Sequence, residues 1–212
     1  MCDNDKDMER SRAQFLRAES VVEFMELWSR FYENGICIPT YLSTFLEGSD
    51  RNEFATRELG LKLKDIARRG FLATDSQITI PGEQKGYITG YVPEKMAQIL
   101  AEELNRYSGI VAFYNDIKEF EESVSAGLYV TYDSTAEEVT EAVKLRKMLG
   151  EPFTSVGNTD PDSFEMIREW MSEPVKKKMT KKRYKYFVVV SPCHDSPPHL
   201  VFDKLLEVLK SI

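Results

Sequence analysis

The fold is decided by residues 86–114, GYITGYVPEKMAQILAEELNRYSGIVAFY, which predict a strand, a helix and a second strand. Residues 86–92 form the first predicted strand and residues 110–114 the second. Pro93 suits the first turn of the helix between them, because its missing N–H donor costs nothing there, and Gly109 supplies the stop. A helix that joins two strands permits parallel pairing through a right-handed crossover, so this stretch indicates an α/β fold.

Helices and strands are predicted on both sides of this unit. The N-terminal part is helical, because Ser20 and Glu23 have the spacing of a capping box and Gly35 supplies a stop. Further helices are predicted at about residues 50–69, 135–149, 160–171 and from 200 onward, and further strands at residues 71–74, 127–132 and 186–190. We therefore expect a single α/β domain over residues 13–212, with a mixed sheet and flanking helices, after a flexible polar tail at residues 1–12.

The composition of the 212 residues excludes several classes of protein. Apolar residues make up 42% of the chain and aromatic residues 11%, which is too many for a disordered acidic chain. No window is long and apolar enough to span a membrane, and the polar N-terminus resembles neither a secretory signal nor a transit peptide. The three cysteines are too few and too scattered for a disulfide framework. We expect an intracellular protein in a reducing compartment.

Positive charge is concentrated in one short segment. Seven cations fall within ten residues, with no acid among them: Lys176, Lys177, Lys178, Lys181, Lys182, Arg183 and Lys185. The rest of the chain carries 21 bases against 35 acids, which disfavours a broad nucleic-acid surface but leaves a local anionic contact open. The run attracts polyanions and is similar to a nuclear-import signal. The alternative is a solvated loop that begins an edge strand, where lysines discourage pairing between sheets.

Polar side chains gather where the strand predicted at residues 71–74 ends. Thr74, Asp75, Ser76 and Gln77 follow one another there, and Gln84 comes shortly after. Ligands of α/β folds bind at the carboxyl ends of strands, so these five residues form a candidate ligand site. Ser76 and Gln77 could donate to a phosphate or a peptide carbonyl, and Asp75 could orient a hydroxyl. The alternative is turn chemistry, because Asp and Ser commonly bond their own backbone at strand ends.

Several motifs follow one another in a distinctive order. They are Trp28 with Phe31, Gly70-Phe71 with Thr74, Ser76-Gln77, Gln84 and Gly86-Tyr87-Ile88. Over residues 15–115 this order resembles an uncharacterised protein family of large double-stranded DNA viruses, marseillevirus-like ones among them, with some bacterial members. The family pattern often has glycine or proline directly after Ser-Gln, where this chain has Ile78. The family has no known activity, so the resemblance implies a viral origin rather than a mechanism.

Catalytic and metal-binding signatures are sparse. Cys193, His194 and Asp195 follow the strand predicted at residues 186–190, and His199 comes shortly after. A Cys193 nucleophile with either histidine as its base is one interpretation, and a surface loop between prolines is the other. Two histidines and three dispersed cysteines give no closely spaced pair of zinc ligands, and nucleotide-binding and hydrolase motifs are absent. We expect no catalytic residue, no metal and no cofactor.

Three functional hypotheses stay open from the sequence. We favour a non-enzymatic viral accessory or host-interaction protein, which would bind a protein partner in the host cytoplasm or nucleus and use its local basic segment. The second hypothesis is an enzyme or small-ligand protein with a polar crevice around residues 74–77. The third is a minor component of the virus particle. The sequence leaves the oligomeric state open.

Overall fold

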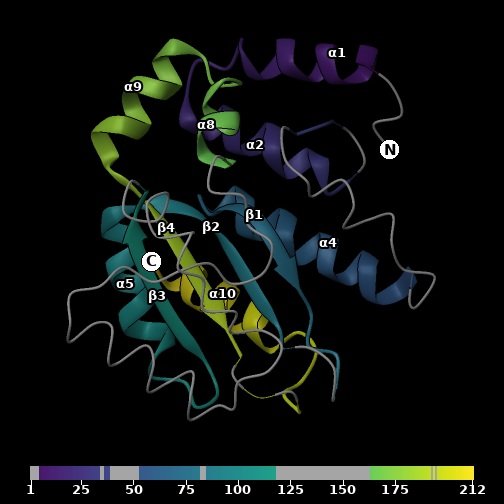
Figure 1. Cartoon of the computed structure of the whole chain (residues 1–212), viewed down its shortest axis with the longest axis vertical. Helices are drawn as coiled ribbons and strands as arrows, with labels where there is room; N and C mark the ends of the chain where they lie inside the picture. The colour runs from purple at the N-terminus through teal and green to yellow at the C-terminus, as the bar shows by residue number, and fades with distance from the viewer. Residues whose placement is uncertain are drawn as a thin grey trace.

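The computed structural model describes residues 5–33, 36–38, 53–81, 85–117, 163–191, 193 and 195–212. Within these residues a four-stranded sheet is flanked by helices, so the protein is α/β (Figure 1). The strands are β1 (Leu72–Gln77), β2 (Tyr87–Pro93), β3 (Val111–Asp116) and β4 (Tyr184–Val190). The helices are α1 (Asp5–Phe15), α2 (Val21–Phe31), α4 (Glu53–Arg68), α5 (Glu94–Leu104), α8 (Ser163–Arg168), α9 (Glu173–Lys182) and α10 (Leu200–Ser211). Over these ranges no helix has the length and apolar character needed to traverse a membrane.

The sheet has the strand order β1-β2-β4-β3, and each neighbouring pair in it is antiparallel. Strands β2 and β3, which α5 joins, run in the same direction, but β4 lies between them and pairs with both. The parallel pairing that residues 86–114 permit is therefore not made between β2 and β3, and over the described residues the sheet is antiparallel rather than mixed as expected. The unit is a split β–α–β arrangement, in which a strand from much later in the chain fills the gap left by the crossover.

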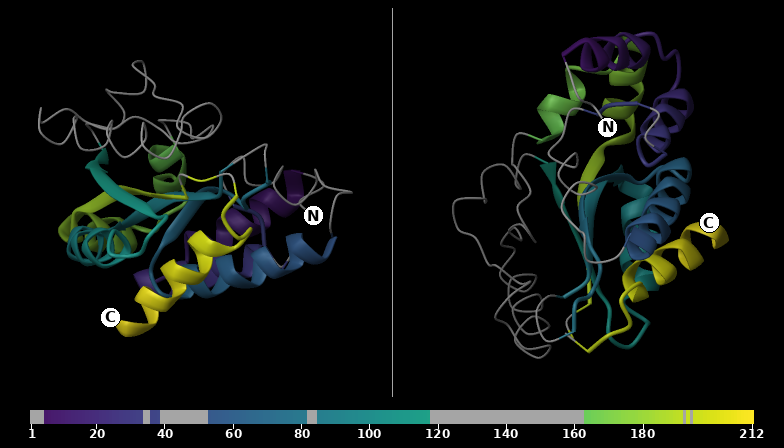
Figure 2. Two further views of the ribbon diagram at one scale, coloured as in Figure 1. Left: turned by 90° about the horizontal axis from the view of Figure 1, so that it is seen from below. Right: turned by 90° about the vertical axis from the view of Figure 1, so that its right-hand side faces the viewer.

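Helices cover the sheet unequally on its two faces. Helices α4, α5 and α10 cover one face, and α8 lies on the side of the other (Figure 2). The ring of Tyr91 in β2 lies 4.7 Å from the ring of Phe164 in α8, which fixes the face that α8 contacts. All seven residues of β4 are buried, as expected for a strand inside the sheet. Beyond one end of the sheet, α1, α2, α8 and α9 form a helical layer (Figure 1).

Some of the helix caps and stops predicted from the sequence are confirmed. The Ser20 hydroxyl accepts a hydrogen bond from the Glu23 amide at 3.2 Å, as predicted, although the Glu23 carboxylate returns to the Glu19 amide at 2.7 Å rather than to that of Ser20. Gly70 follows α4 with a φ angle of 93°, which glycine adopts at low cost. The stop predicted at Gly109 is wrong, because α5 already ends at Leu104 with Asn105 as its C-cap, and Gly109 lies in the following turn with a φ of 79°. The strand predicted at residues 127–132 and the helix predicted at 135–149 lie outside the described residues.

Residues 5–12 belong to helix α1, in contrast to the polar tail expected at residues 1–12. Met8 packs against the core, Ser11 is buried and Phe15 is completely buried, so one side of this helix faces inward. The Ser11 hydroxyl accepts a hydrogen bond from the Cys37 amide at 2.9 Å. Cys37 is also disulfide-bonded, which the scattered cysteines did not lead us to expect. The inward residues have helical spacing, but the polar majority of the segment hides it.

The basic segment forms helix α9 and the start of the inner strand β4, rather than a loop and an edge strand. The Ser172 hydroxyl caps α9 by accepting from the Val175 amide at 3.4 Å, and Pro174 stands in the first turn, where proline is favoured. Val175 and Met179 are buried and hold the helix against its neighbours. The lysines are thus carried on a packed helix.

Arg183 ends α9 with a φ of 50°, the left-handed region that favours glycine. We expect Arg183→Gly to raise the free energy of unfolding by about 0.5–1 kcal/mol, because glycine relieves roughly 1–2 kcal/mol of strain at some cost in chain entropy. Lys182→Gly, one residue earlier in helical conformation, should instead lower it by about 0.5–1 kcal/mol. Urea denaturation measures both changes, and similar losses for the two variants would contradict the strain at Arg183.

Candidate functional site

The residues predicted as a ligand site at the end of β1 do not meet at one point. Four of them lie within the strand itself: Thr74, Asp75, Ser76 and Gln77. Asp75 and Gln77 share one face of the strand, and Ser76 points to the opposite face, where it is 2% exposed. The Ser76 hydroxyl has no hydrogen-bond partner within the described ranges. Gln84 lies outside the described residues.

Two of these residues make contacts across the sheet. Asp75 accepts a hydrogen bond from the Tyr87 hydroxyl at 3.0 Å, and the hydroxyl oxygen of Thr74 lies 3.5 Å from that of Thr89. The register of β1 against β2 shifts between Ala73 and Asp75, so these contacts flank a bulge. Thr74 and Asp75 therefore help to hold the edge strand on its neighbour, and their role in ligand binding stays a prediction.

The exposed lysines of α9 lie on one side of the helix. Lys177, Lys178, Lys181 and Lys182, here called the lysine face, are all exposed. Their spacings of three and four residues place them next to one another along the helix surface, whereas Val175 and Met179 are buried against the protein. Like charges at these spacings repel one another weakly. An anion bound across the lysine face would relieve that repulsion.

No member of the lysine face forms an ion pair with any described residue. The other cations of the segment have acidic neighbours. Lys176 Nζ lies 3.0 Å from a Glu173 oxygen, and the Arg183 guanidinium lies 4.0 Å from Glu94. Within the described part of the chain, four positive charges are therefore uncompensated on one exposed helix surface.

Lys185, the last cation of the segment, has a structural role. It lies in β4 with a side chain only 9% exposed, 2.5 Å from an Asp116 oxygen and 3.4 Å from a Glu94 oxygen. Burial alone would lower the pKa of Lys185, but the hydrogen bonds and charges of Asp116 and Glu94 raise it above its ordinary value. The buried ammonium joins β4, β3 and the start of α5 and is not available to a partner.

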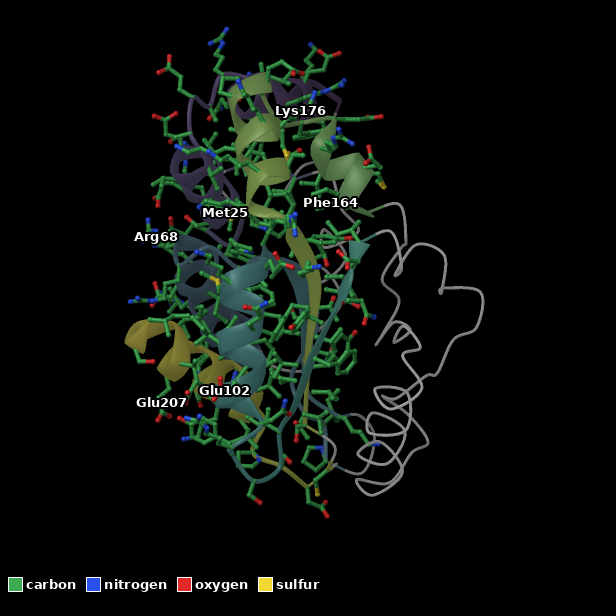
Figure 3. The ribbon with its side chains drawn as sticks, turned by 90° about the vertical axis from the view of Figure 1, so that its left-hand side faces the viewer. Met25, Arg68, Glu102, Phe164, Lys176 and Glu207 are labelled. Carbon is green, nitrogen blue, oxygen red and sulfur yellow. The ribbon has the colours of Figure 1, made fainter. Side chains whose placement is uncertain are left out.

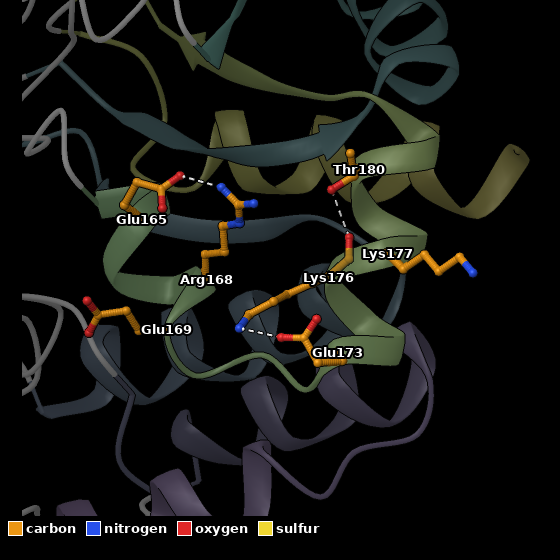
Figure 4. A pocket seen from close by; sticks show the side chains of 7 residues that line it. All are labelled: Glu165, Arg168, Glu169, Glu173, Lys176, Lys177 and Thr180. Carbon is orange, nitrogen blue, oxygen red and sulfur yellow. Dashed lines mark hydrogen bonds and ion pairs between the residues drawn. The ribbon is translucent and has the colours of Figure 1, made fainter.

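A hollow of about 610 Å³ lies between α8 and α9 (Figure 4). It is lined by Glu165, Arg168, Glu169, Glu173, Lys176, Lys177 and Thr180. Two of its cations are neutralised within their own helices, because Arg168 lies 3.0 Å from Glu165 and Lys176 lies 3.0 Å from Glu173. Lys177 lines the hollow and also belongs to the lysine face, so the two surfaces adjoin.

Sequence reasoning identified the lysines of this surface but missed the residues of α8. A local signal for α9 existed, because Ser172 followed by Glu173 and Pro174 is typical of a helix start. No local signal indicates that Glu165 and Arg168 of α8 lie beside α9. That neighbourhood comes from the tertiary fold.

Of the two histidines predicted as a base for Cys193, only His199 lies within the described residues, and no hydrogen bond joins it to Cys193 there. Cys193 is an exposed free thiol. The imidazole of His199 lies 3.5 Å from Glu58 and near the ring of Phe202, and burial lowers the pKa of His199. His194 lies outside the described residues. Over the described ranges no group of three potential metal ligands gathers.

The surface formed by α8 and α9 is suited to binding anions. Exposed ammonium groups without acidic partners attract carboxylates and phosphates, and each can donate charge-assisted hydrogen bonds to them. No protein-family model and no curated protein matches the sequence.

Proposed function

We propose that this protein is a non-enzymatic binding protein whose lysine face holds an acidic segment of another protein. The observation that carries the proposal is the set of four uncompensated lysines on the exposed surface of α9. Several cations of the described chain, such as Lys62, Arg68 and Arg106, lie against acids of their own fold, whereas Lys95 and Lys210 are exposed and make no ion pair with a described residue. The lysine face differs from these single positions because it gathers four such cations on one helix surface, where the carboxylates of one partner could bind together.

A polypeptide fits this surface better than a nucleic acid does. Glu165, Glu169 and Glu173 line the hollow beside the lysine face and would repel a continuous phosphate backbone. Further acids such as Glu102 and Glu207 lie at the other end of the molecule from Lys176 (Figure 3). An acidic protein segment can place its carboxylates over the lysine face alone and present other residues to the hollow.

The resemblance to a family of large DNA viruses supports a host protein as the partner. Packaging as a minor component of the virus particle is the remaining alternative, and mass spectrometry of purified particles tests it. Reading the segment as an extended nuclear-import signal is less suited to the fold, because α9 would have to unwind and expose Val175 and Met179. The fold therefore disfavours nuclear import through α9, and the disulfide at Cys37 is uncommon for a protein of the host cytoplasm or nucleus.

Neutralising the lysine face should remove most of the affinity for an acidic peptide. We expect the variant with Lys177, Lys178, Lys181 and Lys182 changed to glutamine to bind a fluorescein-labelled polyglutamate peptide at least about tenfold more weakly, because four charge-assisted contacts are lost. Fluorescence anisotropy measures the affinity, and the difference should shrink as salt is added.

A matched control separates position from net charge. Changing Lys6, Arg17, Lys95 and Lys210 to glutamine removes four exposed cations elsewhere and should leave the affinity close to that of the wild type. Equal weakening in both variants would show that only net charge matters and would overturn the proposal. Tighter binding of duplex DNA, or of phosphatidylserine vesicles, than of the peptide would overturn the choice of a protein partner.

A further inference from the structure

We propose that a small apolar pocket beside the lysine face receives one apolar side chain of the same acidic partner. The inference rests on the proposed function and adds a sequence requirement for the partner. The pocket measures about 240 Å³ and lies where α8, α9 and the start of β4 meet. Its apolar walls come from Ile117, Phe164, Met171, Met179 and Tyr184.

The size of the pocket indicates a single side chain. Pockets for small-molecule ligands usually measure about 300–1,000 Å³, so this one is small for a whole metabolite. Met171, Met179 and Tyr184 are buried, whereas Ile117 and Phe164 are half-buried. Methionine walls adapt to the shape of an incoming apolar group. A leucine, methionine or phenylalanine of a partner matches these properties.

The charge beside the pocket indicates that the inserted side chain has acidic neighbours. Arg168, Lys176 and Arg183 line the pocket, and the first two are already paired with Glu165 and Glu173 of their own helices. The Arg183 side chain is 77% exposed and lies only at the outer limit of an ion pair with Glu94, at 4.0 Å, so its guanidinium can meet a carboxylate of the partner. An apolar residue flanked by acids would satisfy both the walls and the opening.

The pocket and the lysine face are continuous across α9. Arg168, Lys176 and Thr180 line both the pocket and the larger hollow, and Lys177 joins that hollow to the lysine face. A single extended segment can therefore place carboxylates on the lysine face and an apolar side chain in the pocket. Without the apolar contact, binding would depend on charge alone and would have little sequence preference.

Two glutamate-rich labelled peptides that differ only in their central residue, leucine or alanine, test the inference. We expect the leucine peptide to bind the wild-type protein about tenfold more tightly in fluorescence anisotropy, because burial of an aliphatic side chain favours the complex. Thr180→Phe should fill the pocket from an exposed position and abolish this preference. Ser108→Phe, on an exposed turn after α5, is the matched control and should keep the preference.

Each outcome separates this inference from the proposed function. If neither peptide binds the wild type, the proposed function fails. If both bind equally, or if the leucine preference survives Thr180→Phe, the pocket inference alone is overturned. Sedimentation velocity adds an independent readout: a wild-type dimer that Thr180→Phe dissociates would show that the pocket receives a second copy of this chain, which would also overturn the inference.

Discussion

Replacing Gly90 with alanine is expected to lower the free energy of unfolding by about 3 kcal/mol, the upper range for overpacking in a core. A Cβ atom at Gly90 would lie 2.2 Å from the Leu72 carbonyl oxygen, 2.7 Å from the Phe71 ring and 2.8 Å from the Ala73 Cα. Two of these neighbours are backbone atoms of β1, which pairs with β2 at this point. Relief of the clash therefore requires the edge strand to move away.

The same substitution at Gly60 is the matched control. Gly60 lies inside α4, and a Cβ atom there would meet only the Tyr32 carbonyl oxygen at 3.4 Å, an ordinary contact. Gly60→Ala should stabilise the protein by about 0.5–1 kcal/mol, because alanine is the better helix former. Urea denaturation followed by circular dichroism measures both variants. A Gly90→Ala variant as stable as the wild type would show that β1 is not held as closely as the structure indicates.

The strand–helix–strand unit at residues 86–114 could be predicted, but its place in the sheet could not. The apolar stretches on either side of Pro93 and the helical pattern after it are local signals, and they predicted β2, α5 and β3. The neighbour of each strand depends on β4, whose residues 184–190 come about seventy positions later. The apolar run there predicted a buried strand without indicating which strands it pairs with. Local sequence patterns therefore could not decide whether each strand has parallel or antiparallel neighbours.

The charge of the candidate site was visible in the sequence, whereas its shape was not. Counting cations identified the run from Lys176 to Lys185. Its division into an exposed lysine face and the buried Lys185 depends on the helix that ends at Lys182 and on the acids that the sheet brings to Lys185. The pocket requires Phe164 and Ile117, which no pattern around the lysines indicates. The charge of the site can thus be predicted from a short stretch of sequence, whereas its concave shape depends on residues that only the tertiary fold brings together.

An aromatic cluster supports the helices that carry the site. Trp28 in α2 is completely buried, with the ring of Phe24 at 6.1 Å and the ring of Phe15 of α1 at 6.2 Å. Phe15 in turn lies 5.7 Å from Trp170, in the connection between α8 and α9. The hydroxyl of Ser172, which caps α9, also donates to the Ala18 carbonyl at 2.5 Å. The position of α9 therefore depends on the packing of α1 and α2.

Trp28→Ala should lower the free energy of unfolding by about 3–5 kcal/mol, because it removes a large buried side chain and leaves a cavity. We expect the substitution also to loosen the connection between α8 and α9, where Trp170 lies. Trp170 is the one tryptophan that remains in the variant and is 7% exposed in the wild type. Its fluorescence should shift to longer wavelength as its packing loosens. Val22→Ala, on the same helix but 78% exposed, should change the stability by less than about 0.5 kcal/mol.

The same variant tests whether the aromatic cluster matters for binding. If the helical layer positions the lysine face, Trp28→Ala should weaken binding of the polyglutamate peptide under conditions where the protein is still folded, although Trp28 is a fully buried residue that the peptide does not reach. Hydrogen exchange should then show faster opening of α9 than of β4, because α9 is attached to the fold through α2 and its neighbours. Weaker peptide binding with unchanged hydrogen exchange in α9 would contradict the idea that the aromatic cluster acts by holding α9 in place. The loss of affinity would then need a cause other than a loosened helix.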